Sequence, residues 1–144
     1  MAIINILDCG AVADAKTSCT AAIKTAVDKC AENGGGTVFV PAGTYLTGPI
    51  FLKSNINLNL EAGATLLFSN DIEEYPVVTS RWEGVKQDCY ASLINADNCE
   101  NISITGRGTL DGQGAFWWKI FRAKENKYQR PKMIAPYECK NVLI

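Results

Sequence analysis

The segment NCENISI at residues 98–104 recurs as ECKNVLI at residues 138–144, and this recurrence decides the fold. The two copies share a Cys, an Asn and an alternating apolar tail in the same phase, and a weaker copy, SNINLNL, stands at residues 54–60. Repeats of this kind are typical of stacked units that bury their apolar faces on one another. The sequence therefore predicts a solenoid. Because the chain ends inside a repeat, further coils are expected to be missing from it.

Between the repeats, short apolar runs alternate with turn residues from residue 37 to residue 144. No helical pattern separates these runs, so the sequence predicts an all-β chain of parallel coils. An antiparallel sandwich would also give short strands, and the in-phase repeat is what favours the parallel solenoid. Two interruptions, near residues 70–90 and 112–136, are predicted to be insertions on a face that often binds ligands.

A single helix is predicted at residues 17–32. Its apolar residues recur at helical spacing and form one stripe, made of Cys19, Ala22, Ile23, Ala26, Val27 and Cys30. Thr17 or Ser18 can cap the start of this helix, and the Asn-Gly-Gly-Gly run at residues 33–36 ends it. A phosphate-binding role for this run is rejected, because it follows a helix and precedes a strand, which reverses the order of a phosphate loop.

The composition is that of one ordinary soluble domain. The chain has 144 residues, of which 47% are hydrophobic and 20% charged, and its net charge is −1. This charge indicates neither nucleic acid nor a membrane surface as a partner, and no apolar run approaches the ~20 residues of a membrane helix. No signal peptide follows Met1, which favours a cytoplasmic protein and leaves secretion open.

Six cysteines and the absence of histidine limit the chemistry of the chain. Without a secretory signal, the cysteines are predicted to be free thiols. Cys99 and Cys139 share one repeat phase and are predicted to be buried in an internal stack. No Cys-x-x-Cys pair occurs, so a zinc site is not expected. The sequence predicts no metal and no cofactor.

Several segments carry a family resemblance that covers nearly the whole chain. They are DCGAV (residues 8–12), GGGTVFVPAGTY (34–45), TGPIFLKS (47–54), GRGTLDGQG (106–114) followed by Trp117-Trp118, and CKNVLI (139–144). Together they resemble glycoside hydrolase family 28, the polygalacturonases, within the pectin-lyase-like superfamily. The glycine-rich and Pro-Ala-Gly-Thr-Tyr elements are similar across the superfamily, whereas the segment at 106–114 with its tryptophan pair is more specific to polygalacturonases.

This resemblance implies a right-handed parallel β-helix with one N-terminal capping helix at residues 17–32 and coils over residues 37–144, all in a single domain. It also implies hydrolysis of α-1,4-galacturonic linkages with inversion, which needs two carboxyl groups. The family's Asn-Thr-Asp, Asp-Asp and Gly-His-Gly motifs do not occur, and no Arg-x-Lys sits on a repeat strand. The chain is therefore predicted to be the N-terminal part of such an enzyme, C-terminally truncated, without catalytic residues and inactive alone.

Arg81 and Trp82, in the first insertion, are the predicted substrate-binding residues. An arginine can hold a uronate carboxylate with two hydrogen bonds, and an indole can stack on a sugar ring. The alternative interpretation is that Trp82 packs the loop onto the barrel while Arg81 pairs with Glu83 or another acidic residue. Trp117-Trp118 is predicted to serve mainly in the core and in loop anchoring, since two adjacent aromatic residues cannot both face one subsite.

The second insertion and the residues after it carry a local excess of positive charge. Against Glu125 and Glu138, residues 119–140 contain Lys119, Arg122, Lys124, Lys127, Arg130, Lys132 and Lys140. Such a surface would attract a polyanionic pectate, but a solvated loop has the same composition, and both interpretations stay open. The adjacent carboxylates Glu73-Glu74 are predicted to lie on a solvated face.

The expected partner is an acidic polysaccharide or oligogalacturonide derived from pectin. A non-catalytic β-helix module that binds polysaccharide or has a structural role is the alternative function. A pectate lyase is a further alternative, but the clustered carboxylates of its calcium site are not visible in the sequence. The last strand, at residues 139–144, would present an unpaired edge, so self-association through it is also expected.

Overall fold

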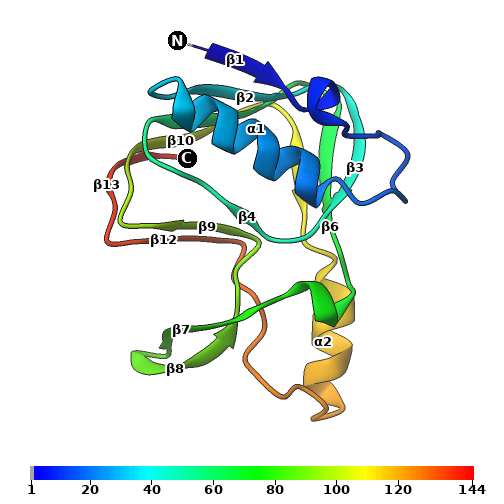
Figure 1. The fold of residues 1–144 in the computed structure, drawn as a ribbon. Helices are drawn as coiled ribbons and strands as arrows, with labels where there is room; N and C mark the ends of the chain where they lie inside the picture. Colours follow the sequence, from blue (N-terminus) through cyan, green and yellow to red (C-terminus); the bar gives the residue numbers. More distant parts are fainter. Residues whose placement is uncertain (1) are drawn as a thin grey trace.

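The computed structural model describes residues 2–144, and strands dominate them. The strands are β1 (Ala2–Asn5), β2 (Gly36–Val40), β3 (Gly43–Thr47), β4 (Ile50–Phe51), β5 (Ile56–Leu60), β6 (Ala64–Phe68), β7 (Val77–Trp82), β8 (Val85–Tyr90), β9 (Ile94–Asp97), β10 (Glu100–Gly106), β11 (Thr109–Asp111), β12 (Ile134–Tyr137) and β13 (Lys140–Leu143). The helices are α1 (Thr20–Glu32) and α2 (Gly114–Arg122), with the short 3-10 helices η1 (Ile6–Cys9) and η2 (Ile72–Glu74) (Figure 1).

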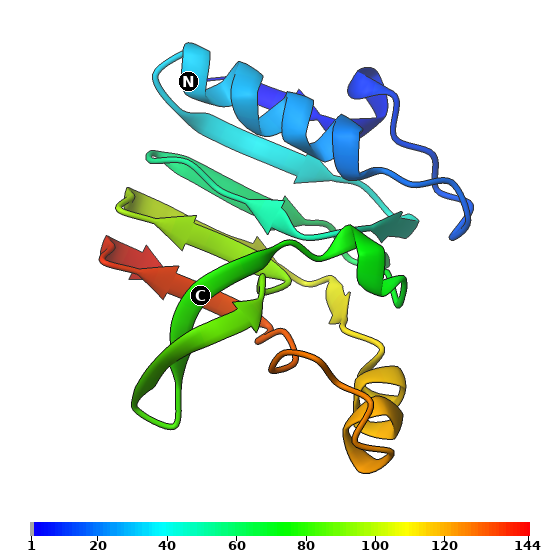
Figure 2. The same ribbon diagram turned by 60° about the horizontal axis from the view of Figure 1, so that its bottom comes forward.

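Apart from β7 and β8, the strands of residues 2–144 pair in three parallel sheets. Their orders are β1-β2-β5-β10-β13, β3-β6-β11 and β4-β9-β12. The chain passes through the three sheets in turn, so that β2, β3 and β4 form one circuit, and each later circuit stacks on the one before it (Figure 2). The two repeat copies lie side by side in β10 and β13, with Ile102 opposite Val142. This parallel pairing excludes the antiparallel sandwich.

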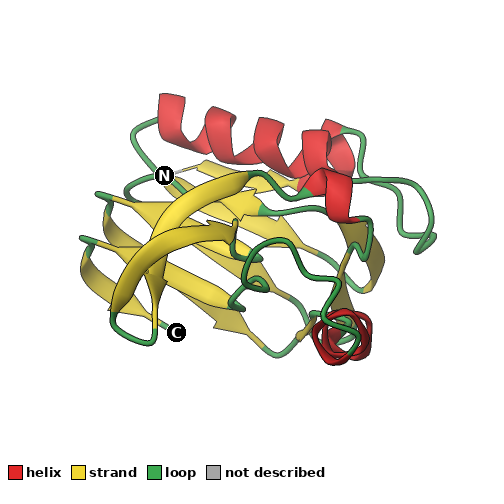
Figure 3. Cartoon of the chain, turned by 90° about the horizontal axis from the view of Figure 1, so that it is seen from below, coloured by secondary structure: helices red, strands yellow, loops and turns green. Residues whose placement is uncertain are grey.

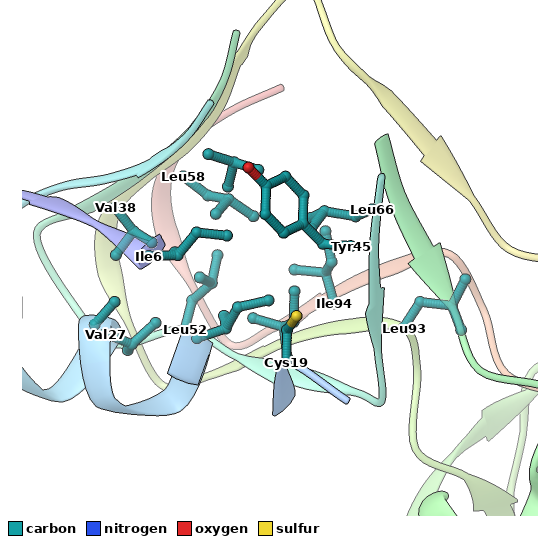
Figure 4. Packing of buried hydrophobic residues seen from close by; sticks show 14 of the residues in the cluster. Ile6, Cys19, Val27, Val38, Tyr45, Leu52, Leu58, Leu66, Leu93 and Ile94 are labelled. Carbon is teal, nitrogen blue, oxygen red and sulfur yellow. The ribbon is translucent and has the colours of Figure 1, made fainter. Parts of the chain in front are cut away.

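Inward-facing side chains of successive strands form columns in the core. Val38 lies opposite Leu58, which in turn lies opposite Ile104. Val38 and Leu58 are fully buried, because every second residue of a strand points to the same face. Burial of such a side chain stabilises the fold by about 1.5–3 kcal/mol. Figure 4 shows the neighbours that surround this column, among them Ile6, Tyr45, Leu52, Leu66 and Ile94.

A ladder of asparagines explains the Asn that recurs in the repeat. Asn55, Asn101 and Asn141 all have left-handed backbone conformations, with φ of 65°, 55° and 57°. The side-chain amide of Asn101 donates to Oδ1 of Asn55, and that of Asn141 donates to Oδ1 of Asn101, both at 3.0 Å. Asparagine tolerates the left-handed region better than most residues, so one residue type supplies both the turn and the bond to the next circuit.

Helix α1 begins at Thr20 rather than at residue 17, so its predicted start is wrong. Ser18 forms a parallel bridge with Leu46, and the carboxylate of Asp14 accepts hydrogen bonds from the backbone and the hydroxyl of Thr17. Both residues are thus held outside the helix, and Cys19 stands at the N-cap without a side-chain cap bond. The predicted end at residue 32 is confirmed, since Asn33 is the C-cap.

The stripe on α1 is buried against the first circuits. The helix contacts η1, β1, β2 and β4, and its buried residues are Ala22, Ile23, Ala26, Val27 and Cys30. Figure 3 shows α1 lying along one side of the stacked strands, with α2 well separated from it. None of the helices within residues 2–144 has the length and apolar character that crossing a bilayer requires.

The two predicted insertions contain regular structure that the sequence patterns did not reveal. The first holds an antiparallel hairpin, in which β7 pairs with β8 from Val77 opposite Tyr90 to Trp82 opposite Val85. The second begins with α2, so the prediction of a single helix is wrong. This helix has only 9 residues. A helix so short is marginal by itself, and packing of its buried Trp117 supplies the stability that local propensity does not.

All six cysteines lie in the described part of the chain and are free thiols, as predicted. Cys99 is buried and Cys139 half-buried, and both Sγ atoms donate to backbone carbonyls, including Leu52 and Ala96 respectively. Burial raises the pKa of the Cys99 thiol, which keeps it protonated. The predicted burial of the cysteine stack is therefore confirmed for Cys99, whereas Cys139 remains partly exposed to solvent.

Candidate functional site

The candidate site is a cleft of about 480 Å³ where the end of β11 meets α2 and the segment at residues 130–133. Its lining includes Asp111, Gln113, Trp117, Trp118, Arg130 and Met133. Gln113 shapes one wall, because its backbone is left-handed (φ 49°, ψ 46°) and turns the chain from β11 into α2. Its N–H donates to Oδ1 of Asp111 at 2.9 Å, and its Nε2 donates to the carbonyl of Phe68 at 2.7 Å.

A row of arginines and aromatic rings, packed on one another, extends from this cleft onto the neighbouring surface. The guanidinium carbon of Arg130 lies 5.0 Å from the ring centroid of Trp82 and 5.5 Å from that of Phe121. Phe121 stacks on Trp118 with 5.5 Å between centroids and 18° between planes, and Arg122 lies 5.0 Å from the Trp118 centroid. We call Trp82, Arg130, Phe121, Trp118 and Arg122 the cation–aromatic ladder. Each such contact contributes about 0.5–1 kcal/mol at an exposed site.

Three separate segments bring the ladder together. Trp82 ends β7, Trp118 and Phe121 belong to α2, and Arg130 lies on the strap, which we define as residues 128–133. Figure 1 shows the hairpin β7–β8 and α2 at the same end of the molecule, with the strap passing between them. The N–H of Tyr90 donates to the carbonyl of Gln129 at 3.1 Å, which adds the strap to the edge of β8.

An aromatic cluster beneath the ladder anchors α2. The buried ring of Trp117 packs edge-on against Tyr75 at 5.0 Å and against Phe116 at 5.1 Å, and it also contacts Tyr90 at 5.7 Å. Tyr128 of the strap packs edge-on against Tyr90 at 5.4 Å. Burial raises the pKa of Tyr75 and of Tyr90, so both phenols stay neutral at physiological pH. The ladder therefore rests on a neutral, apolar base.

The cations of residues 119–140 form no ion pair within 4.0 Å in the described structure. Within residues 2–144, the ion pairs are those of Asp28 with Lys24 on α1 and with Lys53 just after β4. None of the seven basic residues is therefore neutralised by an ion pair, although Lys132 donates to the backbone carbonyl of Arg81. No group of three His, Cys, Asp or Glu side chains in the described residues is placed to hold a metal ion.

Comparison with known proteins finds similarity to a pectate lyase-like family model and to polygalacturonases. A family model described as rhamnogalacturonase A/epimerase, pectate lyase-like, matches residues 3–59. A "probable polygalacturonase" of Vitis vinifera is 39% identical over 90% of this chain and 28% of its own length. The structure of a hyperthermoactive exopolygalacturonase from Thermotoga maritima superposes with a TM-score of 0.83 at 34% identity, over 98% of this chain and 40% of that one.

A family 28 exopolygalacturonase from Yersinia enterocolitica is similar too, with a TM-score of 0.71 and 42% identity over 76% of this chain and 20% of that one. The chain is therefore similar to the N-terminal part of family 28 polygalacturonases. It spans less than half the length of these three relatives, so it corresponds to only a part of each.

The two residues predicted from the sequence, Arg81 and Trp82, have different surroundings in the structure. Trp82 is half-buried in the ladder, whereas Arg81 is exposed and points to the opposite face of β7, because successive side chains of a strand alternate. Arg81 makes no ion pair with Glu83 in the described structure. The arginine that contacts Trp82 is Arg130, 48 positions further along the chain (130 − 82).

Sequence reasoning missed Phe121, Arg122 and Arg130 as individual site residues. The basic run at residues 119–140 included Arg122 and Arg130, but no pattern indicated which cation would meet an aromatic ring. Of the tryptophan pair, Trp117 anchors α2 as predicted, while Trp118 is 46% exposed and joins the ladder.

The carboxylate pair on η2 is only partly solvated. Glu73 is exposed as predicted, but Glu74 is half-buried and its Oε2 has no hydrogen-bond partner in the described structure. The prediction is therefore wrong for Glu74, because η2 turns it toward the groove between α1 and β4.

Proposed function

We propose that the chain is the N-terminal part of a polygalacturonase-type glycoside hydrolase, which cleaves α-1,4-galacturonic linkages of pectin with inversion. The observation that carries this proposal is the cation–aromatic ladder beside the cleft. Aromatic rings suit the apolar faces of sugars, and unpaired arginines suit uronate carboxylates. The names of the family 28 relatives support an acidic polysaccharide as the substrate class.

In this proposal, the three parallel sheets are the first coils of a right-handed parallel β-helix, and α1 covers its open end. Support comes from the position of α1 in the chain, between β1 and β2, and from its buried stripe. The first coil of a solenoid exposes strand edges and an open core, and an amphipathic helix covers both.

The chain contributes binding rather than bond cleavage. Inverting hydrolysis requires one carboxylic acid that protonates the leaving oxygen and a carboxylate that activates water, ~6.5–9.5 Å apart. The family's motifs for these groups do not occur in the 144 residues. We therefore assign the catalytic carboxylates to later coils of the whole enzyme.

The test compares the natural full-length protein with a protein of residues 1–144. The full-length protein is expected to release reducing ends from polygalacturonate, and residues 1–144 alone are expected to release none. If the full-length protein binds polygalacturonate but cleaves nothing, the non-catalytic polysaccharide-binding module replaces this proposal. Cleavage by residues 1–144 alone would contradict the assignment of the carboxylates to later coils.

A further inference from the structure

Arg130 is the central cation of the ladder, and its surroundings leave one part of it free. Its guanidinium carbon lies over the Trp82 ring, 5.0 Å from the centroid, and over the Phe121 ring, 5.5 Å from the centroid. A guanidinium has five N–H donors, and the Trp and Phe rings offer no conventional hydrogen-bond acceptor, so these contacts leave its donors available to an acceptor. Among the described residues no carboxylate lies within 4.0 Å of Arg130 and no side-chain hydrogen bond of Arg130 is formed.

We propose that Arg130 is a specificity-determining residue that binds the carboxylate of a uronate unit in the cleft, and so distinguishes free uronate from its methyl ester. This inference rests on the proposed function and names the residue that recognises the uronate carboxylate. Arg130 lines the same cleft as Trp118, so one sugar unit can place its carboxylate at the guanidinium and its ring near an aromatic side chain.

The shape of a guanidinium favours a carboxylate as the ligand of Arg130. A carboxylate is planar and can accept two parallel hydrogen bonds from one guanidinium. A lysine ammonium is a point charge and cannot donate such a pair of bonds. Trp82 and Phe121 restrict the rotamers of the side chain before the ligand arrives, which lowers the entropic cost of binding. A half-buried position also weakens the screening of the charge by water.

The experiment uses the 144-residue protein, with two ligands that differ in whether the uronate carboxyl groups are free or methyl-esterified. Oligogalacturonate and its methyl ester have the same sugar backbone, and affinity is measured by titration calorimetry for each. Arg130→Gln is expected to weaken binding of the free acid about tenfold and to leave binding of the ester unchanged. Arg130→Lys keeps the positive charge but cannot donate two parallel hydrogen bonds to one carboxylate. Its affinity for the free acid is therefore expected to lie between those of the wild type and Arg130→Gln.

Lys124→Gln is the matched control, because it removes one exposed positive charge from the same basic region without touching a ring. It is expected to weaken binding of the free acid by less than about twofold. Thermal melting of each variant checks that the fold is intact, and Arg130→Lys provides a second measurement if Arg130→Gln is unstable.

Two results would overturn the inference, and they differ in what they say about the proposed function. If Arg130→Gln and Lys124→Gln weaken binding equally, the attraction is a general charge effect and Arg130 has no specific role, while the proposed function stands. If the protein binds dextran sulfate as tightly as oligogalacturonate and the full-length protein cleaves no polygalacturonate, both the inference and the proposed function fail.

Discussion

Lys132 donates a hydrogen bond from Nζ to the backbone carbonyl of Arg81 at 2.6 Å, which ties the strap to the hairpin β7–β8. This bond joins residues 51 positions apart and holds Trp82, the neighbour of Arg81, near Arg130. A side chain on one insertion thus fixes the geometry of the other.

Replacing Lys132 by Met should loosen the hairpin without unfolding the chain. The bond has a charged donor and is partly exposed, so its loss should lower the free energy of unfolding by about 1 kcal/mol. Hydrogen exchange should accelerate in β7 and β8, and the affinity for oligogalacturonate should fall. Lys124→Met, which removes the same charge elsewhere, should leave exchange in the hairpin unchanged. Equal exchange in both variants would show that the strap does not hold the hairpin.

Adjacent tryptophans should differ sharply in their effect on stability. Trp117 is 6% exposed and Trp118 is 46% exposed. Trp117→Ala should cost about 3–5 kcal/mol through a cavity in the aromatic cluster, whereas Trp118→Ala should cost less than about 1.5 kcal/mol. Trp117→Phe should cost less than Trp117→Ala, since the Nε1–H that it removes has no partner in the described structure. Urea unfolding measures all three, and similar values for both alanine variants would refute the anchoring role of Trp117.

A charge on the buried face of α1 should destabilise the first circuits. Ile23 and Val27 are each 1% exposed. Ile23→Asp or Val27→Asp should lower the free energy of unfolding by at least about 3 kcal/mol, because an unpaired carboxylate would be buried. Thr25→Asp adds the same group on the exposed side of α1 and should change stability by no more than about 0.5 kcal/mol. Thermal melting separates the outcomes, and unchanged melting of both buried-site variants would mean that α1 is not packed as described.

The asparagine ladder should respond differently to alanine and glycine. Asn101 has φ of 55°, a conformation that glycine adopts freely and alanine does not. Asn101→Gly should cost about 1 kcal/mol through the lost amide bonds. Asn101→Ala should cost about 1 kcal/mol more, because it adds backbone strain. Chemical denaturation gives both values, and an alanine variant at least as stable as the glycine variant would argue against a held left-handed turn.

The outer edge of β13 should promote self-association of the 144-residue protein. Among the described strands β13 has a partner only on the β10 side, and Leu143 and Ile144 are 63% and 66% exposed. An unpaired apolar edge can pair with a second chain. Leu143→Lys should suppress the concentration-dependent species in sedimentation velocity, while Val85→Lys, at an exposed apolar position on the hairpin, should not. Sedimentation of the unmodified 144-residue protein as a monomer at all concentrations would contradict this prediction.

Local patterns predicted the parts of the fold that depend on local periodicity. The recurrence of NCENISI predicted two stacked strands, and β10 and β13 do pair in register. The apolar stripe of α1 and the glycine-rich end of this helix were also predicted, since a helix of 13 residues has an unambiguous apolar face. The start of α1 was misplaced because Ser18 pairs with Leu46, a contact that no local pattern records.

By itself, the sequence determined the repeat, the parallel stacking and the charge of the surface. Periodicity and composition are local properties of the chain and can be read without knowing which distant residues meet. Only the tertiary structure decided that Arg130 meets Trp82 and Phe121 while Arg81 faces away. Those contacts join three segments distant in the chain, and they depend on the strap adding to β8 and on α2 packing through Trp117. The physical reason is that a cation–aromatic contact is too weak to direct folding, and so its partners are chosen by the packing of the elements that carry them.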